Sequence, residues 1–289
     1  MVILWVPLLN IWIISEGLKV PTACRVGYIH LEKSNKFSGK RVLITGASRG
    51  LGYICAQYFE KWGAQLVVNG RTQEKLDTLQ SGFSKPSQHL MIKADLLDDG
   101  EIDSMMNKVN DFMGGIDIVV HTLGGGYGFS DPLLSKKQFQ ILHALNLGVA
   151  AEINRLVVPE MQKRKSGNLI HVCSVASQEA TGSVGYNTVK AALAAYVRSL
   201  GRELAESEVI ATGILPGGFY APDNVWKRHK VKTPERVQEF IENRLPRKKM
   251  GEASEIIPLI ALLASRDASM MAGSCVPIDA GEGLAYLSV

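Results

Sequence analysis

The segment SVGYNTVKAA, residues 183–192, places a tyrosine, Tyr186, four residues before a lysine, Lys190. Residues four apart lie on one face of an α-helix, so the ammonium group would lie beside the phenol. An ordinary phenol transfers protons poorly as a base at neutral pH because its pKa is about 10. A neighbouring cation favours the phenolate form. The pair is therefore either a general acid/base with its activating cation or two residues that share a helix face. Chance produces such pairs, so the surrounding residues must decide.

A serine, Ser174, follows the apolar run NLIHVC (168–173) and precedes Tyr186 by twelve residues. Its hydroxyl could hydrogen-bond a substrate carbonyl oxygen and stabilise the charge that develops there. Tyr186 would protonate that oxygen as hydride arrives, or remove the proton in the reverse direction. Cys173 is expected to be a packing residue, because no base is placed to activate its thiol. These residue types predict oxidoreduction between a carbonyl and a secondary alcohol.

A phosphate-binding turn is predicted at TGASRGLG, residues 45–52, directly after the apolar run RVLIT. The amino end of the following helix offers free N–H groups, and the glycines let a pyrophosphate approach the backbone. The spacing is Gly-x3-Gly-x-Gly, formed by Gly46, Gly50 and Gly52.

The second apolar run ends in VVNGRT, which bears on the choice between NAD and NADP. An enzyme for NAD usually has an acidic residue here to hold the ribose 2′-hydroxyl. This chain has Asn69 and Gly70, followed by Arg71, which can pair with a 2′-phosphate. Arg49 inside the glycine turn adds a second cation. NADP(H) is therefore predicted; the alternative is that Arg71 is a solvated loop residue.

The elements that must position these residues alternate between strands and helices. Continuous apolar strands alternating with helices indicate an α/β fold with one doubly wound parallel sheet of about seven strands, covered on both faces. The expected strands are 41–45, 65–69, 89–94, 116–121, 168–173, 209–215 and 275–279, and the expected helices are 51–62, 74–83, 99–113, 136–163, 184–205 and 253–265.

Over roughly residues 38–284 the chain resembles the classical short-chain dehydrogenase/reductase family, and in general pattern its 3-oxoacyl-carrier-protein reductases. The resemblance rests on seven segments in the family's order. They are TGASRGLG, KADL (93–96), LNLG (145–148), HVCSVAS (171–177), YNTVK (186–190), PGG (216–218) and AGSCVPIDAGEG (272–283).

This resemblance implies a single Rossmann-type domain over residues 37–289 and a role for each matching residue. The implied catalytic residues are Ser174, Tyr186, Lys190 and Asn146, with Asn146 supporting a water that leads to solvent. Lys190 would also hold the nicotinamide ribose. The expected NADP(H)-binding residues are Thr45, Gly46, Ser48, Arg49, Gly50, Leu51, Gly52, Arg71, Asp95, Leu96, Gly124, Tyr186, Lys190, Pro216, Gly217 and Phe219, and no metal ion is expected.

The chain departs from the family pattern in two places. The family's usual Asn-Asn-Ala-Gly is HTLG here, so His121 replaces the first asparagine, either as a titrating group or as a hydrogen-bonding residue at a strand end. Gly124–Gly126 would form a flexible wall near the substrate. Ala221 stands where the family commonly has threonine, which leaves the nicotinamide carboxamide to backbone groups such as those of Phe219.

Residues 219–247 are predicted to form a substrate lid containing the basic run WKRHKVK (226–232). Such a run suits an anionic substrate or a carrier-protein surface, and the alternative is a solvated face. The substrate is left open between a 3-oxoacyl thioester and a sugar or nucleotide-sugar of surface-polysaccharide synthesis. The small residues AALAA (191–195) and the resemblance imply a homodimer or homotetramer.

Composition limits the remaining possibilities. A net charge of +4 in 289 residues is too small to predict nucleic-acid binding, and the four cysteines have no metal or disulfide spacing, which favours the cytoplasm. Residues 1–36 form an apolar extension of uncertain role. As a helix, residues 1–14 would reach about 21 Å, too short to span a bilayer, so membrane contact by this segment is possible but not favoured. A catalytically silent binding protein and a membrane-attached reductase are the alternative functions.

Overall fold

A computed structural model describes residues 2–6, 11–15 and 36–285 of the chain. The chain divides into two compact units, residues 1–33 and 34–289. In the first unit, strand β1 (Val2–Val6) pairs antiparallel with strand β2 (Ile11–Ser15). The apolar segment considered above as an anchor therefore contains two short strands. Residues 7–10 and 16–35, including Cys24, lie outside the described residues.

The second unit is built on one parallel sheet of seven strands, in the order β11-β8-β7-β6-β3-β4-β5. The predicted α/β fold with a doubly wound parallel sheet is therefore confirmed. The strands are β3 (Arg41–Thr45), β4 (Gln65–Gly70), β5 (Leu90–Lys93), β6 (Ile118–His121), β7 (Gly167–Val172), β8 (Val209–Pro216) and β11 (Cys275–Ile278).

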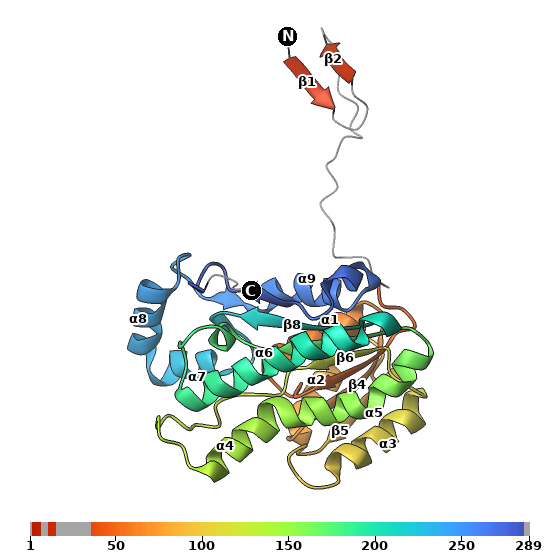
Figure 1. Ribbon diagram of the computed structural model, residues 1–289, viewed down its shortest axis with the longest axis vertical. Helices are drawn as coiled ribbons and strands as arrows, with labels where there is room; N and C mark the ends of the chain where they lie inside the picture. Colours follow the sequence, from red (N-terminus) through yellow and green to blue (C-terminus); the bar gives the residue numbers. More distant parts are fainter. Residues whose placement is uncertain (1, 7–10, 16–35, 286–289) are drawn as a thin grey trace. The chain divides into compact units, whose positions relative to one another are not determined.

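Helices cover both faces of this sheet (Figure 1). On one face α1 packs against α9, and on the other α3 packs beside α5. The helices are α1 (Gly50–Lys61), α2 (Gln73–Ser81), α3 (Glu101–Met113), α4 (Lys136–His143), the π-helical turn η2 (Ala144–Gly148), α5 (Val149–Lys163), α6 (Val184–Leu204) and α9 (Ala253–Leu263). Short 3₁₀ helices are η1 (Pro86–Gln88), η3 (Val175–Ser177), η4 (Ala205–Ser207) and η5 (Arg266–Met271).

The predicted lid region lies between β8 and α9 in the sequence and forms a small group of elements outside the main sheet. It contains β9 (Phe219–Tyr220), α7 (Val225–Lys232) and α8 (Pro234–Arg244), and β9 pairs in parallel with β10 (Gly251–Glu252). The rings of Trp226 and Phe240 lie 4.2 Å apart and pack on a cluster that includes the buried Val237. The lid therefore has its own apolar contacts to hold α7 against α8.

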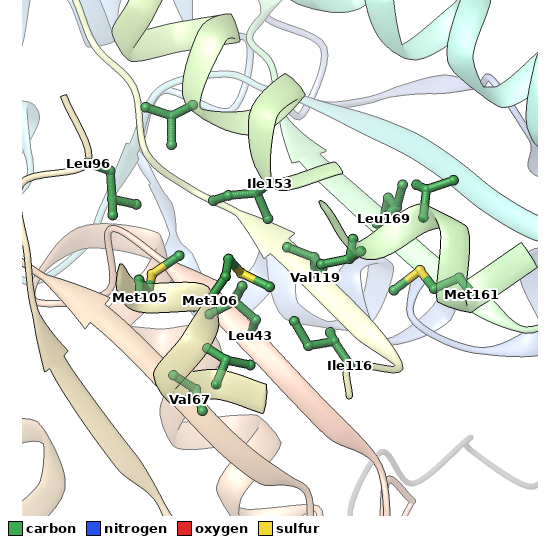
Figure 2. Close-up of a cluster of buried hydrophobic side chains, with 14 of the residues drawn as sticks. Leu43, Val67, Leu96, Met105, Met106, Ile116, Val119, Ile153, Met161 and Leu169 are labelled. Atoms are coloured by element: carbon green, nitrogen blue, oxygen red, sulfur yellow. The ribbon is translucent and has the colours of Figure 1, made fainter. Parts of the chain in front are cut away.

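The core between the sheet and helices α3 and α5 explains why the strands are continuous apolar runs. Figure 2 shows Leu43 and Val119 of the sheet facing Met106 of α3 and Ile153 of α5. Fully burying a side chain of this size contributes about 1.5–3 kcal/mol. A strand buried on both faces has apolar side chains on each face, so its sequence is a continuous apolar run rather than an alternation of apolar and polar residues.

The strand order reverses between β3 and β6, the two neighbours at the centre of the sheet. In doubly wound sheets, ligands bind outside the carboxyl ends of the strands at this point. The glycine turn follows β3, His121 ends β6, and Ser174 follows β7. The topology thus brings the predicted site residues to one edge.

Helices α4 and α5 are joined through η2 into one helical stretch, Lys136–Lys163, as predicted. Among the described residues, this is the one helix long and apolar enough to cross a membrane by length and composition. Its most apolar window is 44% buried inside the protein, and α5 packs on β7 and β8. It is therefore accounted for as a core helix.

Gly201 of α6 allows a close helix-to-loop contact. A Cβ atom there would lie 2.1 Å from the backbone nitrogen of Gly273 and 2.4 Å from its Cα. Backbone atoms cannot rotate away, so we expect Gly201→Ala to lower the free energy of unfolding by about 1–3 kcal/mol, a fall in Tm of roughly 2–4 °C per kcal/mol. Thermal unfolding followed by circular dichroism measures the shift.

Gly148→Ala is the matched control, because a Cβ there would have its nearest neighbours at 3.8 and 3.9 Å. It is expected to hold or raise Tm, since alanine favours a helix over glycine. Equal Tm changes in the two variants would contradict the close contact.

Candidate active site

The glycine turn after β3 has the tight geometry that phosphate binding requires. Gly46 and Gly50 have left-handed backbone angles, with φ of 68° and 66°. A Cβ on Gly52 would lie 2.4 Å from Oγ1 of Thr122, so a larger residue would push α1 away from β6. Arg49 caps α1 with no side-chain hydrogen bond, and the N–H of Gly50 donates to the carbonyl of Pro222 at 2.6 Å.

The end of β4 brings Arg71 and Asp95 together, two residues predicted to bind the cofactor. Their side chains form an ion pair of 3.2 Å, and the side chain of Arg71 is 51% exposed. Asn69 is buried, and its amide donates to the carbonyls of Ile92 and Ala94. Asn69 therefore links β4 to β5, while Arg71 faces solvent. Leu96 is buried in the core, so its side chain faces the protein interior.

Lys190 is the most constrained of the predicted catalytic residues. It is only 3% exposed, and its ammonium donates to the carbonyl of Val172 at 2.8 Å. Its Nζ lies 5.8 Å from the ring centre of Tyr186, one turn earlier in α6. A buried cation is costly unless it is hydrogen-bonded, so this contact fixes where the ammonium lies. Val172 precedes Ser174 by two residues, which ties α6 to the serine segment.

Ser174 caps the short helix η3, and its Oγ accepts a hydrogen bond from the N–H of Ala176 at 3.1 Å. A hydroxyl has one proton to donate besides its acceptor sites. Because Ala176 uses an acceptor site, the proton of Ser174 stays available for an external oxygen. The residue is only 9% exposed.

Asn146 lies in the π-helical turn η2 and is 1% exposed. Its Oδ1 accepts from the N–H of Gly125 at 2.9 Å, and its Nδ2 donates to the carbonyls of Gly125 and Leu142. A Cβ on Gly124 would lie 2.9 Å from Asn146 Oδ1 and 3.0 Å from Lys190 Nζ. Asn146 therefore holds the glycine wall in place, and the missing side chain of Gly124 leaves room beside the ammonium.

His121 belongs to a buried polar network. Its Nε2 donates to Oδ1 of Asn154 at 2.8 Å, and Nδ2 of Asn154 donates to Nε2 of His171 at 3.0 Å. Nδ1 of His171 in turn donates to the carbonyl of Thr212 at 3.0 Å. The two imidazole rings stack with centres 4.7 Å apart. His171 is neutral in this network, because its Nε2 accepts and its Nδ1 donates. His121 is a hydrogen-bonding residue at the strand end, one of the two interpretations above, and its buried Nδ1 has no hydrogen-bond partner in the described structure.

Burial also changes the titration of this pair. It lowers the pKa of His171 to about 4 and holds the pKa of His121 well below its ordinary value. The pKa of His121 is lowered further because a proton on either ring would oppose a proton on the other. Cys173 is buried as well. Its hydrogen bond to Cys275 and its burial raise the pKa of its thiol, which fits a packing role. Within the described part of the chain, no cluster of residues fits a metal ion.

A carboxylate cluster behind the PGG turn was not found from the sequence. Oε2 of the buried Glu282 accepts from the N–H of Gly218 at 2.5 Å, and desolvation raises the pKa of Glu282. Glu179 accepts from the N–H of Ala285 at 2.7 Å and lies 3.7 Å from the guanidinium of Arg244 in α8. These contacts join the segment after Ser174, the lid region and residues 282–285. The partners are far apart in the sequence, so no local signal could reveal them.

Two cavities border these elements. One of about 460 Å³ is lined by Gly217, Gly218, Phe219 and residues around β10 and β11. The other, of about 240 Å³, begins at Val175, the residue after Ser174, and continues to Glu179 and Gly283. The smaller cavity is the one that adjoins the serine segment.

Several cations of the lid region contact partners within the lid region itself. The ammonium groups of Lys227 and Lys230 each lie 5.0 Å from the ring centre of Tyr220. Arg228 binds Asp223. Ala221 is 2% exposed, and the carbonyl of Phe219 accepts from the side chain of Asn224. The basic run is therefore neither wholly solvated nor wholly free for an anionic substrate.

Comparisons with known proteins show that the chain is similar to several oxidoreductases. A family model described as enoyl-(acyl carrier protein) reductase matches residues 46–282. Gluconate 5-dehydrogenase of Gluconobacter oxydans is 27% identical over 248 residues, 84% of this chain and 94% of that protein. The 3-oxoacyl-[acyl-carrier-protein] reductase MabA of Mycobacterium avium is 27% identical over 251 residues, 86% of this chain and 92% of that protein.

Among solved structures, L-sorbose reductase from Gluconobacter frateurii, in complex with NADPH and L-sorbose, superposes with a TM-score of 0.80. It is 26% identical and covers 88% of this chain and 100% of its own. Levodione reductase superposes with a TM-score of 0.78 at 26% identity, covering 87% of this chain and 100% of its own. The similarity therefore includes the whole sheet and its helices.

The buried histidine pair predicts a specific loss of stability in acid. The pKa of His171 is about 4 in the folded protein and about 6.5 in an unfolded chain, so between these values the unfolded chain binds more protons. The contribution of the neutral His171 to the free energy of unfolding is fully present above about pH 6.5. It is lost as the pH falls toward 4, and the total loss for this group is about 3 kcal/mol. Denaturant unfolding at pH 7.5, 6 and 5 measures it.

His121→Asn removes one of the two titrating imidazoles, and the asparagine can still hydrogen-bond to Asn154. Its unfolding free energy should depend less on pH than that of the unmodified protein, although His171 and the buried His89 still contribute. His143→Asn, at an exposed position, is the control and should keep the original dependence. An unchanged pH dependence in His121→Asn would refute the interpretation.

Proposed function

Since the chain belongs to the short-chain dehydrogenase/reductase family, oxidoreductases that act on carbonyl and alcohol groups, we propose that it is an NADP(H)-dependent enzyme using Tyr186 as its general acid/base. The observation that carries the proposal is the buried ammonium of Lys190, anchored to the Val172 carbonyl one helical turn from the Tyr186 ring. A lysine is rarely buried so fully unless its ammonium has partners, and a pair that merely shared a helix face would leave this ammonium in solvent.

The proton path follows from the donors that remain free. Nζ of Lys190 has three N–H groups, and one is used by the Val172 carbonyl. The remaining two can serve the Tyr186 hydroxyl and a ribose hydroxyl of the cofactor. Tyr186 then gives its proton to the substrate oxygen in reduction and takes it back in oxidation. Ser174 donates its hydroxyl proton to the same oxygen and stabilises its developing negative charge.

The residues present fit a dinucleotide with a 2′-phosphate. The positive φ of Gly46 and the lack of room for a Cβ at Gly52 make a tight turn at the amino end of α1. The side chain of Arg71 is half exposed, and β4 itself ends without a carboxylate; the nearby Asp95, from after β5, is paired with Arg71. NADP(H) supplies or accepts the hydride when bound. The choice also agrees with the NADPH complex of L-sorbose reductase.

Two substrate classes receive support from the comparisons. A 3-oxoacyl thioester corresponds to the reductase MabA, and a sugar or nucleotide-sugar corresponds in part to the relatives that act on gluconate and L-sorbose. We propose a small-molecule carbonyl or alcohol, a cytoplasmic location, a homodimer or homotetramer, and no nucleic-acid partner. The two alternatives are a catalytically silent protein on the same fold and a reductase attached to a membrane through residues 1–14. The first is disfavoured because Tyr186 and Lys190 are both present.

Tyr186→Phe is expected to keep the fold and the cofactor affinity while lowering turnover at least about 100-fold, the usual contribution of general acid–base catalysis. Lys190→Met should also weaken NADPH binding, because the same ammonium faces the ribose. Ser174→Ala should reduce turnover alone. A panel of sugars and 3-oxoacyl thioesters, followed by NADPH absorbance, measures turnover, and fluorescence titration measures binding.

Tyr58→Phe is the matched control, since this tyrosine packs on Trp62 at the far end of α1. If Tyr186→Phe kept more than about a tenth of the activity, another group would be the proton donor.

Arg71→Asp is expected to narrow or reverse a preference for NADPH over NADH. A charge-assisted contact with the phosphate contributes about 1.5–3 kcal/mol, or roughly 10- to 100-fold in affinity. Arg202→Asp, on the exposed end of α6, makes the same charge change away from the turn and should leave the preference unchanged. Equal affinity of the unmodified protein for both cofactors would exclude the assignment to NADP.

A further inference from the structure

The expected adenosine end of the cofactor site contains three arginines from three parts of the chain. Arg71 follows β4 and pairs with Asp95 at 3.2 Å. Arg228, from α7 of the lid, binds Asp223 through its backbone carbonyl at 2.5 Å and its carboxylate at 3.4 Å. Arg49, in the glycine turn, has no ion pair within the described ranges.

The first residues of the lid are attached to this end of the site. The carbonyl of Pro222 accepts from the N–H of Gly50 at 2.6 Å. The carboxylate of Asp223, the next residue, forms an ion pair with Lys75 of α2. These two contacts place the start of the lid against both α1 and α2, so Arg228, five residues later and bound back to Asp223, lies beside the glycine turn.

The turn itself is held close to Arg71. A Cβ on Gly70 would lie 2.6 Å from Cβ of Ser48, so the residue before Arg49 packs on the residue before Arg71. Arg49 therefore lies between the arginine of β4 and the arginine of the lid. Arg49 is an exposed residue whose guanidinium is partly desolvated, and this desolvation lowers its pKa. The charges of Arg228 and Arg71 lower the pKa further, while the charge of Asp223 raises it.

The charges at this place do not balance. Four cations, Arg49, Arg71, Lys75 and Arg228, face two carboxylates, Asp95 and Asp223. An excess of positive charge around a guanidinium without a carboxylate partner is the condition that an anion relieves. Among the cations of α7, Lys227 and Lys230 lie against the Tyr220 ring, whereas Arg228 pairs with Asp223 and is thereby connected to this end.

We infer that Arg228 is a third specificity-determining residue for the cofactor: it joins Arg49 and Arg71 around the 2′-phosphate and so couples the lid to the choice of NADP(H). The inference rests on the proposed function, because it requires NADP(H) as the cofactor. Guanidinium groups bind phosphate through two parallel hydrogen bonds, so Arg228 would exchange Asp223 for the phosphate oxygens. The cofactor with the phosphate then holds the lid more firmly than the one without it.

The test separates the phosphate from the rest of the cofactor by using adenosine 2′,5′-bisphosphate and 5′-AMP, which differ in that group. Calorimetry with the full chain should show tighter binding of the bisphosphate. Arg228→Gln should weaken bisphosphate binding about tenfold, the effect of one charge-assisted contact, and leave 5′-AMP unchanged. Arg228→Lys should recover part of the loss. Lys230→Gln, in the same helix, should behave as the unmodified protein.

A second measurement reports on the lid itself. Hydrogen exchange of residues 222–245 should be slower with NADPH than with NADH in the unmodified protein, and Arg228→Gln should remove that difference. If the unmodified chain binds both adenosine ligands equally, the NADP assignment fails and the inference fails with it. If it discriminates, Arg71→Asp abolishes the discrimination and Arg228→Gln does not, the role of Arg228 alone is overturned.

Discussion

The site depends on the burial of one positive charge. Lys190 is almost fully enclosed, and a buried ammonium must satisfy its N–H groups or carry a large free-energy cost. The Val172 carbonyl satisfies one of them, which obliges β7 and α6 to meet at a fixed distance beneath Ser174 and Tyr186. The remaining donors face the space in front of Gly124. Enclosing this cation thus fixes the candidate catalytic residues relative to one another and leaves N–H groups of the ammonium without an acceptor among the described residues.

Small residues make that enclosure possible. A side chain at Gly124 would occupy the space between Asn146 and Lys190, and one at Gly52 would meet Thr122. The first glycine leaves room beside the enclosed ammonium, and the second keeps α1 close to the ends of β3 and β6. Asn146 completes the arrangement by holding both backbone groups of Gly125. Close approach of backbone segments, more than any single polar contact, is therefore what the glycine-rich wall contributes.

The sequence predicts the sheet and its helices well because apolar runs and helical periodicity are local properties. It also places Ser174, Tyr186 and Lys190, since their motifs lie at strand and helix ends whose order the topology fixes. It does not predict the bond between Gly218 and Glu282, which are 64 residues apart, or that between Lys75 and Asp223, which are 148 apart. The stacking of His121 on His171 depends on the register of β6 against β7. The π-helical turn at Asn146 has the sequence pattern of an ordinary α-helix.

The basic lid shows most clearly what folding adds to a charge pattern. In the sequence, WKRHKVK is a run of cations without an acid, which suits an anionic substrate or a solvated face equally well. In the folded chain, Lys227 and Lys230 lie over the ring of Tyr220. Arg228 pairs with Asp223, which also pairs with Lys75 of α2. Which cations stay available is decided by partners outside the run. Through Asp223, Arg228 is thereby connected to Lys75 at the edge where the glycine turn lies, whereas Lys227 and Lys230 lie against the ring of Tyr220.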